Sequence, residues 1–219
     1  MHSFDYTKES NIDTLRDYPL QGYRLMHWLE DVISNWLCDP INMKDERLIS
    51  LLGLNKLDEE TLQALCSTGT PYNTDTKLAG STPKVIISLG GTEYADTPLL
   101  VGNKPNALNG SIPARNNMKI KNVALKVSVY TESYDGTVLL AGLLEDFLAF
   151  NESSLLLDNG SLSSFIVKGT SEVTEIKQGG AANAKTLYAS TIMVVISGGI
   201  TWTTDNQGPV FRGIKYVMS

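Results

Sequence analysis

Apolar residues recur at three- and four-residue steps near the start of the chain, from Asp17 onward. This spacing aligns them on one side of an α-helix and predicts an amphipathic helix of about five turns over residues 17–37. Pro19 stands where a first helical turn tolerates proline, and Asp39-Pro40 ends the pattern. The aligned positions are Leu20, Tyr23, Met26, Leu29, Val32, Ile33, Trp36 and Leu37.

Two shorter helices are predicted next, over residues 44–52 and 58–65. Gly53 ends the first, and Asp58 begins the second as its N-cap, because a carboxylate there accepts hydrogen bonds from free backbone amides. The pattern then changes to one typical of strands. Residues 84–89 are rich in β-branched side chains and lie between a proline and a pair of glycines, so they predict a strand.

The clearest strand is predicted over residues 118–131, where apolar and polar positions alternate. Met118 and Ile120 are out of phase with the rest, so a bulge near Lys121-Asn122 is expected to restore the register. Residues 91–117, before this strand, form a polar stretch that is long for a loop; we predict a working surface there, in part a protruding hairpin. The strand's two faces would carry Val123, Leu125, Val127 and Val129, and Ala124, Lys126, Ser128 and Tyr130.

A second long helix is predicted over residues 137–150, after a turn at Asp135-Gly136. Thr137 would cap it. The helix is expected to pack its apolar stripe against the sheet. That stripe comprises Leu140, Leu143, Leu144, Phe147 and Leu148.

The remainder of the chain is rich in strand patterns, at residues 164–168, 186–197 and 211–217. Both faces of 186–197 are apolar, which predicts a central strand. The small residues of 177–185 suit the mobile tip of a hairpin.

These elements predict an α+β fold with a mixed, mostly antiparallel β-sheet. A long N-terminal helix and a second helix would flank the sheet, with extended loops and hairpins. We expect a single domain over residues 17–219, with a helical insertion at about 41–66. Residues 1–16 are polar and aperiodic, which predicts a flexible N-terminal arm.

The composition is that of a folded globular protein, with 42% hydrophobic and 19% charged residues among 219. The net charge is −6, and lysines and arginines are scattered singly, which argues against nucleic acid as the main partner. No stretch is apolar enough to span a bilayer and the first residues do not resemble a secretory signal, so we expect the protein to stay in a cytosol, with no membrane partner. Cys38 and Cys66 each end a predicted helix and are expected to be reduced structural thiols.

The sequence offers little material for catalysis, and we predict neither an enzyme nor a metal or cofactor site. The only histidines are His2, in the N-terminal arm, and His27, inside the first helix, where a structural role is expected. The acidic pairs are adjacent residues on helices, so their carboxylates diverge. Gly90-Gly91-Thr92 follows a strand, as a phosphate loop would, but lacks the rest of such a motif.

Two other classes of function stay open. A small hydrolase or transferase would use the Gly90-Gly91 segment together with the polar rim at residues 131–134. A module that binds an acyl chain or a peptide would need a deep apolar pocket.

Residues 123–150, VALKVSVYTESYDGTVLLAGLLEDFLAF, form an alternating strand that leads through a short polar turn into a leucine-rich helix. This block resembles the core unit of bacteriophage tail terminator, or tail completion, proteins. In that family a long helix is followed by a strand, an extended hairpin, a strand, a helix and closing strands, and the elements predicted here follow this order. The helices at 44–66 and the long region 151–186 exceed the minimal member of the family.

The resemblance implies a hexameric ring in the virion neck, assembled in the host cytoplasm. The ring would stack on the last ring of tail-tube protein, stop its polymerisation and face the head–neck connector or stopper proteins, while DNA passes through the lumen without specific binding. A neck or tail adaptor and a baseplate subunit are alternatives. The two excursions from the β-framework are expected to join the copies. Candidate interface residues are Glu93, Tyr94, Lys104, Arg115, Lys177 and Lys185.

Overall fold

A computed structural model describes most of the regular structure of the chain. The described residues are 21–39, 42, 46–54, 61–62, 65–69, 82–94, 99–100, 115–158, 162–178, 185–204 and 214–216. The predicted N-terminal arm, the tip of the predicted hairpin between Gln178 and Lys185, and Lys104 lie outside these residues.

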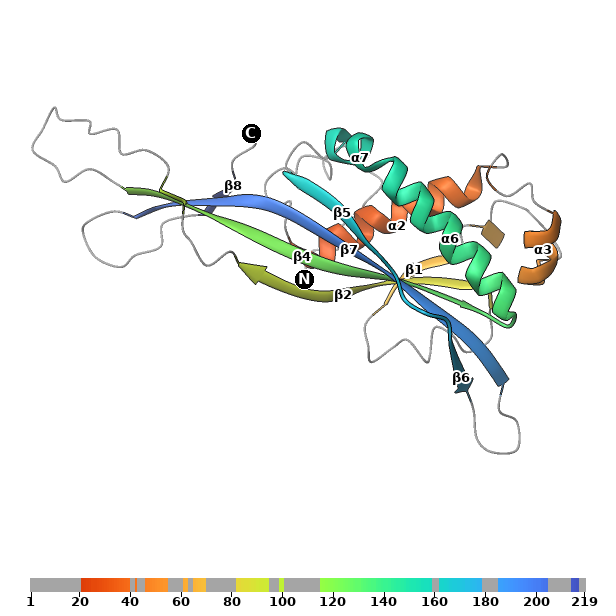
Figure 1. Cartoon of the computed structure of the whole chain (residues 1–219). Helices are drawn as coiled ribbons and strands as arrows, with labels where there is room; N and C mark the ends of the chain where they lie inside the picture. Colours follow the sequence, from red (N-terminus) through yellow and green to blue (C-terminus); the bar gives the residue numbers. More distant parts are fainter. Residues whose placement is uncertain are drawn as a thin grey trace, which may run out of the picture.

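A single sheet of eight strands organises the structure (Figure 1). Its centre consists of three long antiparallel strands, β2 (Lys84–Tyr94), β4 (Arg115–Thr131) and β7 (Lys185–Thr204). The short β1 (Cys66–Thr68) runs parallel to β2, while every other pair is antiparallel. The fold is therefore α+β with a mixed, mostly antiparallel sheet, as the sequence predicts.

Strand β7 is an interior strand of the sheet. One edge pairs with β4 over its whole length. The other edge pairs in succession with β6 (Thr174–Gln178), β5 (Ser164–Thr170) and β8 (Ile214–Tyr216). Pairing on both edges agrees with the apolar character of both faces of the predicted strand.

Helices α2 (Gly22–Cys38) and α6 (Tyr134–Phe150) lie over one face of the sheet, called here the helix-side face (Figure 1). The core between the two layers contains the alternating side chains of the strands and one stripe of each helix. Each such aliphatic side chain contributes about 1.5–3 kcal/mol when fully buried. Fully buried members include Leu29, Ile33, Val85, Val127, Val129, Leu140, Leu144, Phe165, Ile192 and Val194.

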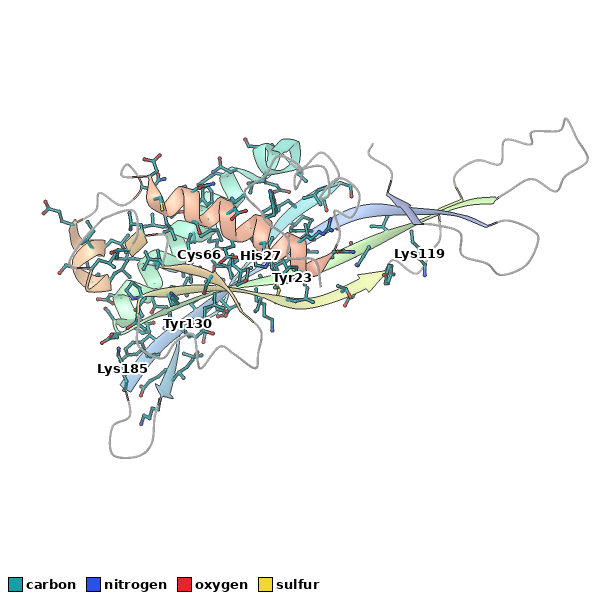
Figure 2. All side chains as sticks on the ribbon, turned by 180° about the vertical axis from the view of Figure 1, so that it is seen from behind. Tyr23, His27, Cys66, Lys119, Tyr130 and Lys185 are labelled. Carbon is teal, nitrogen blue, oxygen red and sulfur yellow. The ribbon has the colours of Figure 1, made fainter. Side chains whose placement is uncertain are left out.

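The ends of the long strands continue beyond the helices as a narrow extension, called here the β-arm (Figure 1). Two short strands, β3 (Leu99–Leu100) and β8, pair with its strands. In Figures 1 and 2 the β-arm points away from all the helices. Its described residues are 91–94, 99–100, 115–122, 198–204 and 214–216.

The strand predicted to stop before Gly90 continues to Tyr94. The extra residue of a β-bulge lies between Leu89 and Gly91, so the bulge is on β2 and not at Lys121-Asn122 of β4. Strand β4 pairs on both edges and keeps an unbroken register with β7. Gly91 has φ 152°, which disfavours a side chain, and this explains a glycine at the bulge.

The change of phase at Met118 and Ile120, which led us to expect a bulge in β4, marks the end of the helix layer. Lys119 and Lys121 occupy the helix-side face there, because they continue the alternation of Val123 and Leu125 along β4.

The starts of the two long helices also differ from prediction. Gln21 has extended backbone angles, so α2 begins at Gly22 and not at residue 17. Helix α6 begins at Tyr134, and its N-cap is Ser133, whose hydroxyl accepts a hydrogen bond from the Gly136 amide. The predicted turn at residues 135–136 is thus the first turn of the helix.

The remaining corrections concern short elements. Helix α3 (Glu46–Leu52) corresponds to the predicted helix at 44–52, and of the helix predicted at 58–65 the described Thr61 and Leu62 are helical. Cys66 opens strand β1 and does not end a helix. Helix α7 (Glu152–Asp158) was not predicted.

Candidate interaction surface

Tyr94 forms the centre of a cationic cluster on the β-arm. It pairs across the strands with Lys121, and Lys119 lies two residues along on the same face. The ammonium groups of Lys119 and Lys121 stand 5.7 and 5.9 Å from the centroid of the Tyr94 ring. Attraction between the cations and the π-electrons of the ring holds the three side chains together. The ring remains 52% exposed, so it can contact a partner.

Partial burial of Lys121 removes water from its ammonium group and lowers the pKa of that group from its ordinary value. A second cation, Lys119, lies against the same Tyr94 ring, so positive charge is concentrated at this point of the β-arm.

Glu93 lies on the opposite face of the β-arm, beside Asn122 of β4. Asn122 in turn accepts a hydrogen bond from the Ser197 hydroxyl at 2.8 Å, which ties β4 to β7. The β-arm therefore has one cationic face and one mainly polar face within its described side chains.

The formal charge of the β-arm is positive, although the whole chain is acidic. Its described positions include four cationic residues, Arg115, Lys119, Lys121 and Lys215, and one carboxylate, Glu93. Attraction to an acidic surface follows from this distribution.

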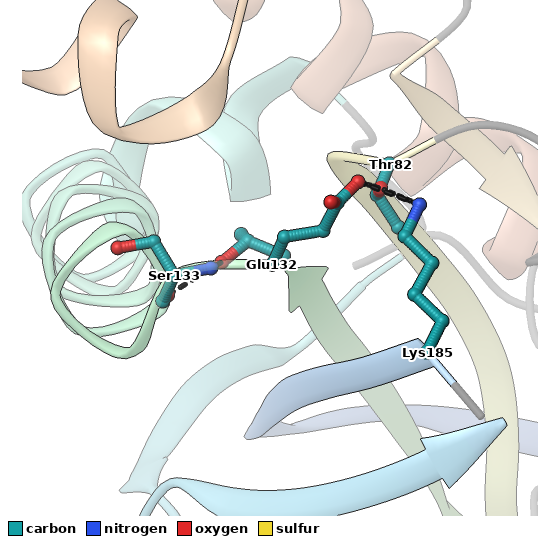
Figure 3. A network of polar contacts seen from close by, with 5 residues as sticks. Thr82, Glu132, Ser133 and Lys185 are labelled. Atoms are coloured by element: carbon teal, nitrogen blue, oxygen red, sulfur yellow. Dashed lines mark hydrogen bonds and ion pairs between the residues drawn. The ribbon is translucent and has the colours of Figure 1, made fainter. Parts of the chain in front are cut away.

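A second polar cluster lies at the other end of the sheet, where β4 ends and β7 begins (Figure 3). The ammonium group of Lys185 donates to the Glu132 carboxylate at 2.6 Å and lies 3.2 Å from the Thr82 hydroxyl, which also donates to Glu132. Hydrogen bonds from Lys185 and Thr82 lower the Glu132 pKa from its ordinary value. The cluster fixes three chain segments that are far apart in sequence.

Replacement of Lys185 by methionine is expected to raise the Glu132 pKa toward its ordinary value, because the largest stabilising hydrogen bond to the carboxylate is lost. With its pKa lowered, Glu132 stabilises the fold above the unfolded-state value of about 4.5, and this contribution disappears as pH falls through the folded-state pKa. A carboxyl NMR titration measures the shift. Lys177→Met is the control, because Lys177 and Lys185 lie on opposite faces of the sheet. An equal shift of the Glu132 pKa in this control would mean that Lys185 does not lower that pKa.

The candidate interface residues fall into two groups. Glu93, Tyr94 and Arg115 lie on the β-arm, while Lys177 and Lys185 lie at the base of the β6–β7 hairpin. Thirteen steps along β7 from Lys185 to Gly198 separate them by about 40 Å. The structure does not bring them together, and Lys104 is outside the described residues.

Sequence reasoning missed Lys119, Lys121 and Thr82, and it considered Glu132 only as part of the polar rim of the alternative site. For the two lysines a signal existed, since they interrupt the apolar positions of a strand pattern at a spacing of two. The partners of Lys185 could not be found in this way, because strand pairing joins residues 53 and 103 positions apart.

The alternative site for a hydrolase or transferase is not assembled. Gly90 and Gly91 are part of the paired strand β2, and Gly91 lies opposite Ala124. The polar rim begins at Thr131, roughly 20 Å along β4. Thr131 and Ser133 are instead engaged in hydrogen bonds at the start of α6.

The remaining reactive side chains have structural surroundings. The Nδ1 atom of His27 lies 2.9 Å from the Glu30 carboxylate, whose other oxygen accepts a hydrogen bond from the Thr68 amide, so this pair joins α2 to β1. Burial raises the pKa of the Cys66 thiol to about 12 and keeps it protonated. Across the residues that the structure describes, no group of three or more histidine, cysteine or acidic side chains could hold a metal ion.

No model of a known protein family matches this sequence, and no curated protein does. In the described part of the chain, none of the helices combines the length and the apolar character needed to cross a membrane. The functional proposal below depends on the arrangement of the elements and on the two charged surfaces.

Proposed function

We propose that this protein is a structural subunit of a phage virion that assembles into a ring in the manner of tail terminator proteins. In that role the ring, a hexamer by resemblance, caps the tail tube and joins it to the connector or stopper proteins of the neck. The protein acts in the virion after assembly in the host cytoplasm. A neck adaptor or baseplate subunit is the variant closest to this proposal.

The observation that carries the proposal is the β-arm, which projects beyond the helix-covered body (Figure 1). A neighbouring copy can bury surface on such a projection that its own chain leaves exposed, as at Tyr94. The element order gives further support. Helix α2, strand β2, the short β3, strand β4, helix α6 and the closing strands follow the order expected for tail terminators.

Two separate interaction surfaces also suit a ring. Closed rings form through heterologous contacts, in which one patch of a subunit binds a different patch of the next. The β-arm cluster around Tyr94 and the Lys185–Glu132 cluster lie at opposite ends of the sheet. A DNA lumen without specific binding agrees with the net charge of −6.

Native mass spectrometry of the purified chain, combined with a pull-down against tail-tube protein, tests the proposal. We expect a discrete ring-sized oligomer that binds assembled tube. A chain that stays monomeric at high concentration and also fails to bind the tube protein would refute the proposal. Negative-stain images of the same sample would distinguish a closed ring from an open filament.

A further inference from the structure

Helix α6 has an unusual surface for a helix that lies on the outside of a sheet. Such helices normally turn a polar face toward water. In α6 the outward side includes Val138, which is 45% exposed, and Phe150, which is 84% exposed, beside the partly exposed Leu143. Gly142 also lies on this side, with open space where a side chain would stand. A surface of this kind favours burial against a partner.

The charges of α6 and α7 are of one sign. Helix α6 contains Asp135, Glu145 and Asp146, and α7 contains Glu152 and Asp158, while neither helix contains a lysine or arginine. Asp135 and Asp146 are exposed on the same side as Gly142, because residues 11 apart on a helix share a face. Glu145 is held toward the sheet by the Thr170 hydroxyl, which donates to it at 2.6 Å.

We propose that the β-arm of one copy docks on the outward face of α6 in a second copy. The inference rests on the proposed ring and names the contact that builds it. The Lys119 and Lys121 ammonium groups are opposite in charge to the carboxylates of α6 and α7, and the exposed ring of Tyr94 supplies apolar surface for Val138 and Phe150.

The contact has to be between copies. In Figures 1 and 2 the β-arm leads away from α6, so its cations cannot reach the helix of their own chain. The two surfaces are different and lie in separate parts of the molecule, which is the requirement for a heterologous contact that repeats around a ring. Opposite charges fix the direction of the contact and disfavour the pairing of like surfaces.

Charge reversal tests the contact. The arm variant, Lys119→Glu with Lys121→Glu, has an acidic arm and an acidic helix layer. The helix variant, Asp135→Lys with Asp146→Lys, has a basic arm and a basic helix face. Each variant alone sets like charges against each other, so we expect association at least about tenfold weaker than in the wild type, measured by sedimentation velocity.

Mixing the two variants gives the decisive result. In an equimolar mixture the acidic arm of the arm variant meets the basic helix face of the helix variant. The basic arm of the helix variant likewise meets the acidic helix face of the arm variant, so assembly should return. Its recovery also shows that both variants fold. The control is Lys126→Glu with Lys168→Glu, which makes the same charge change on exposed strand residues outside the β-arm and should assemble as the wild type does.

The arm contact is overturned if the arm variant assembles like the wild type, or if two folded variants stay dissociated when mixed. Either result would refute the arm contact but not the proposed ring, provided that the wild-type protein forms a ring. A wild-type chain that is monomeric and does not bind tube protein removes the ring and the arm contact together.

Discussion

Phe165→Ala should reduce the free energy of unfolding by about 3–5 kcal/mol, the range for loss of a buried aromatic side chain. Phe165 is fully buried on β5, and its ring meets Trp28 of α2 edge to face, with centroids 6.1 Å apart. Removing the phenyl group leaves a cavity between the sheet and α2 and also removes the aromatic contact. Chemical denaturation followed by tryptophan fluorescence measures the loss.

The neighbouring residue provides the control for this prediction. Ile166 lies on the opposite face of β5 and is 38% exposed, so Ile166→Ala should cost less than about 1.5 kcal/mol. Both variants must be compared at one protein concentration, because assembly stabilises the folded state. Equal losses in the two variants would mean that the helix-side face is not the main core.

Alternation along β4 could be predicted because the helix layer imposes it. Val123, Leu125, Val127 and Val129 are all fully buried, as the period of two requires. The same periodicity located α6, whose Leu140, Leu144 and Leu148 are fully buried, although Leu143 of the predicted stripe is partly exposed. Local patterns therefore predict which residues face the core, wherever a helix or strand is long enough to show its period.

Features that depend on strand pairing could not be predicted. The bulge was expected in β4, but the pairing of β4 on both edges places the extra residue in β2, at Gly90. Which strand contains the extra residue depends on how the strands pair, and a single sequence does not reveal the pairing. Strand β1, with three residues, has too few positions to show any period.

The candidate surface was also predictable only in part, because some of its residues are brought together by strand pairing. The length of the polar stretch over residues 91–117 pointed to Glu93 and Tyr94, yet the residues that give Tyr94 its chemistry, Lys119 and Lys121, come from the neighbouring strand β4. Their contact is a cross-strand pair, which appears only when the register is known. The sequence could thus predict the segment that forms an interaction surface, but not the charge of that surface.

Thr137→Val should reduce the free energy of unfolding by about 1–3 kcal/mol, the cost of leaving buried polar groups without a hydrogen bond. Thr137 was expected to cap α6, but it is fully buried, and its hydroxyl lies 2.9 Å from the Thr131 hydroxyl and 3.2 Å from the Tyr188 carbonyl oxygen. Valine keeps the shape of the side chain and removes these bonds, together with the hydrogen bond that the Thr137 hydroxyl donates to the Ser133 carbonyl oxygen at 3.1 Å. Thermal or chemical denaturation measures the change.

The reverse exchange at the next position separates the hydrogen bonds from the local preference of the helix. Val138 is exposed on the outward face of α6, so Val138→Thr should change stability by less than about 0.5 kcal/mol. A similar loss at both positions would mean that helix propensity, and not the buried hydroxyl, determines the effect. Because the Thr137 bonds join α6 to β4 and β7, their loss should also loosen the helix face on which we propose that the β-arm docks, and Thr137→Val should weaken assembly as well as folding.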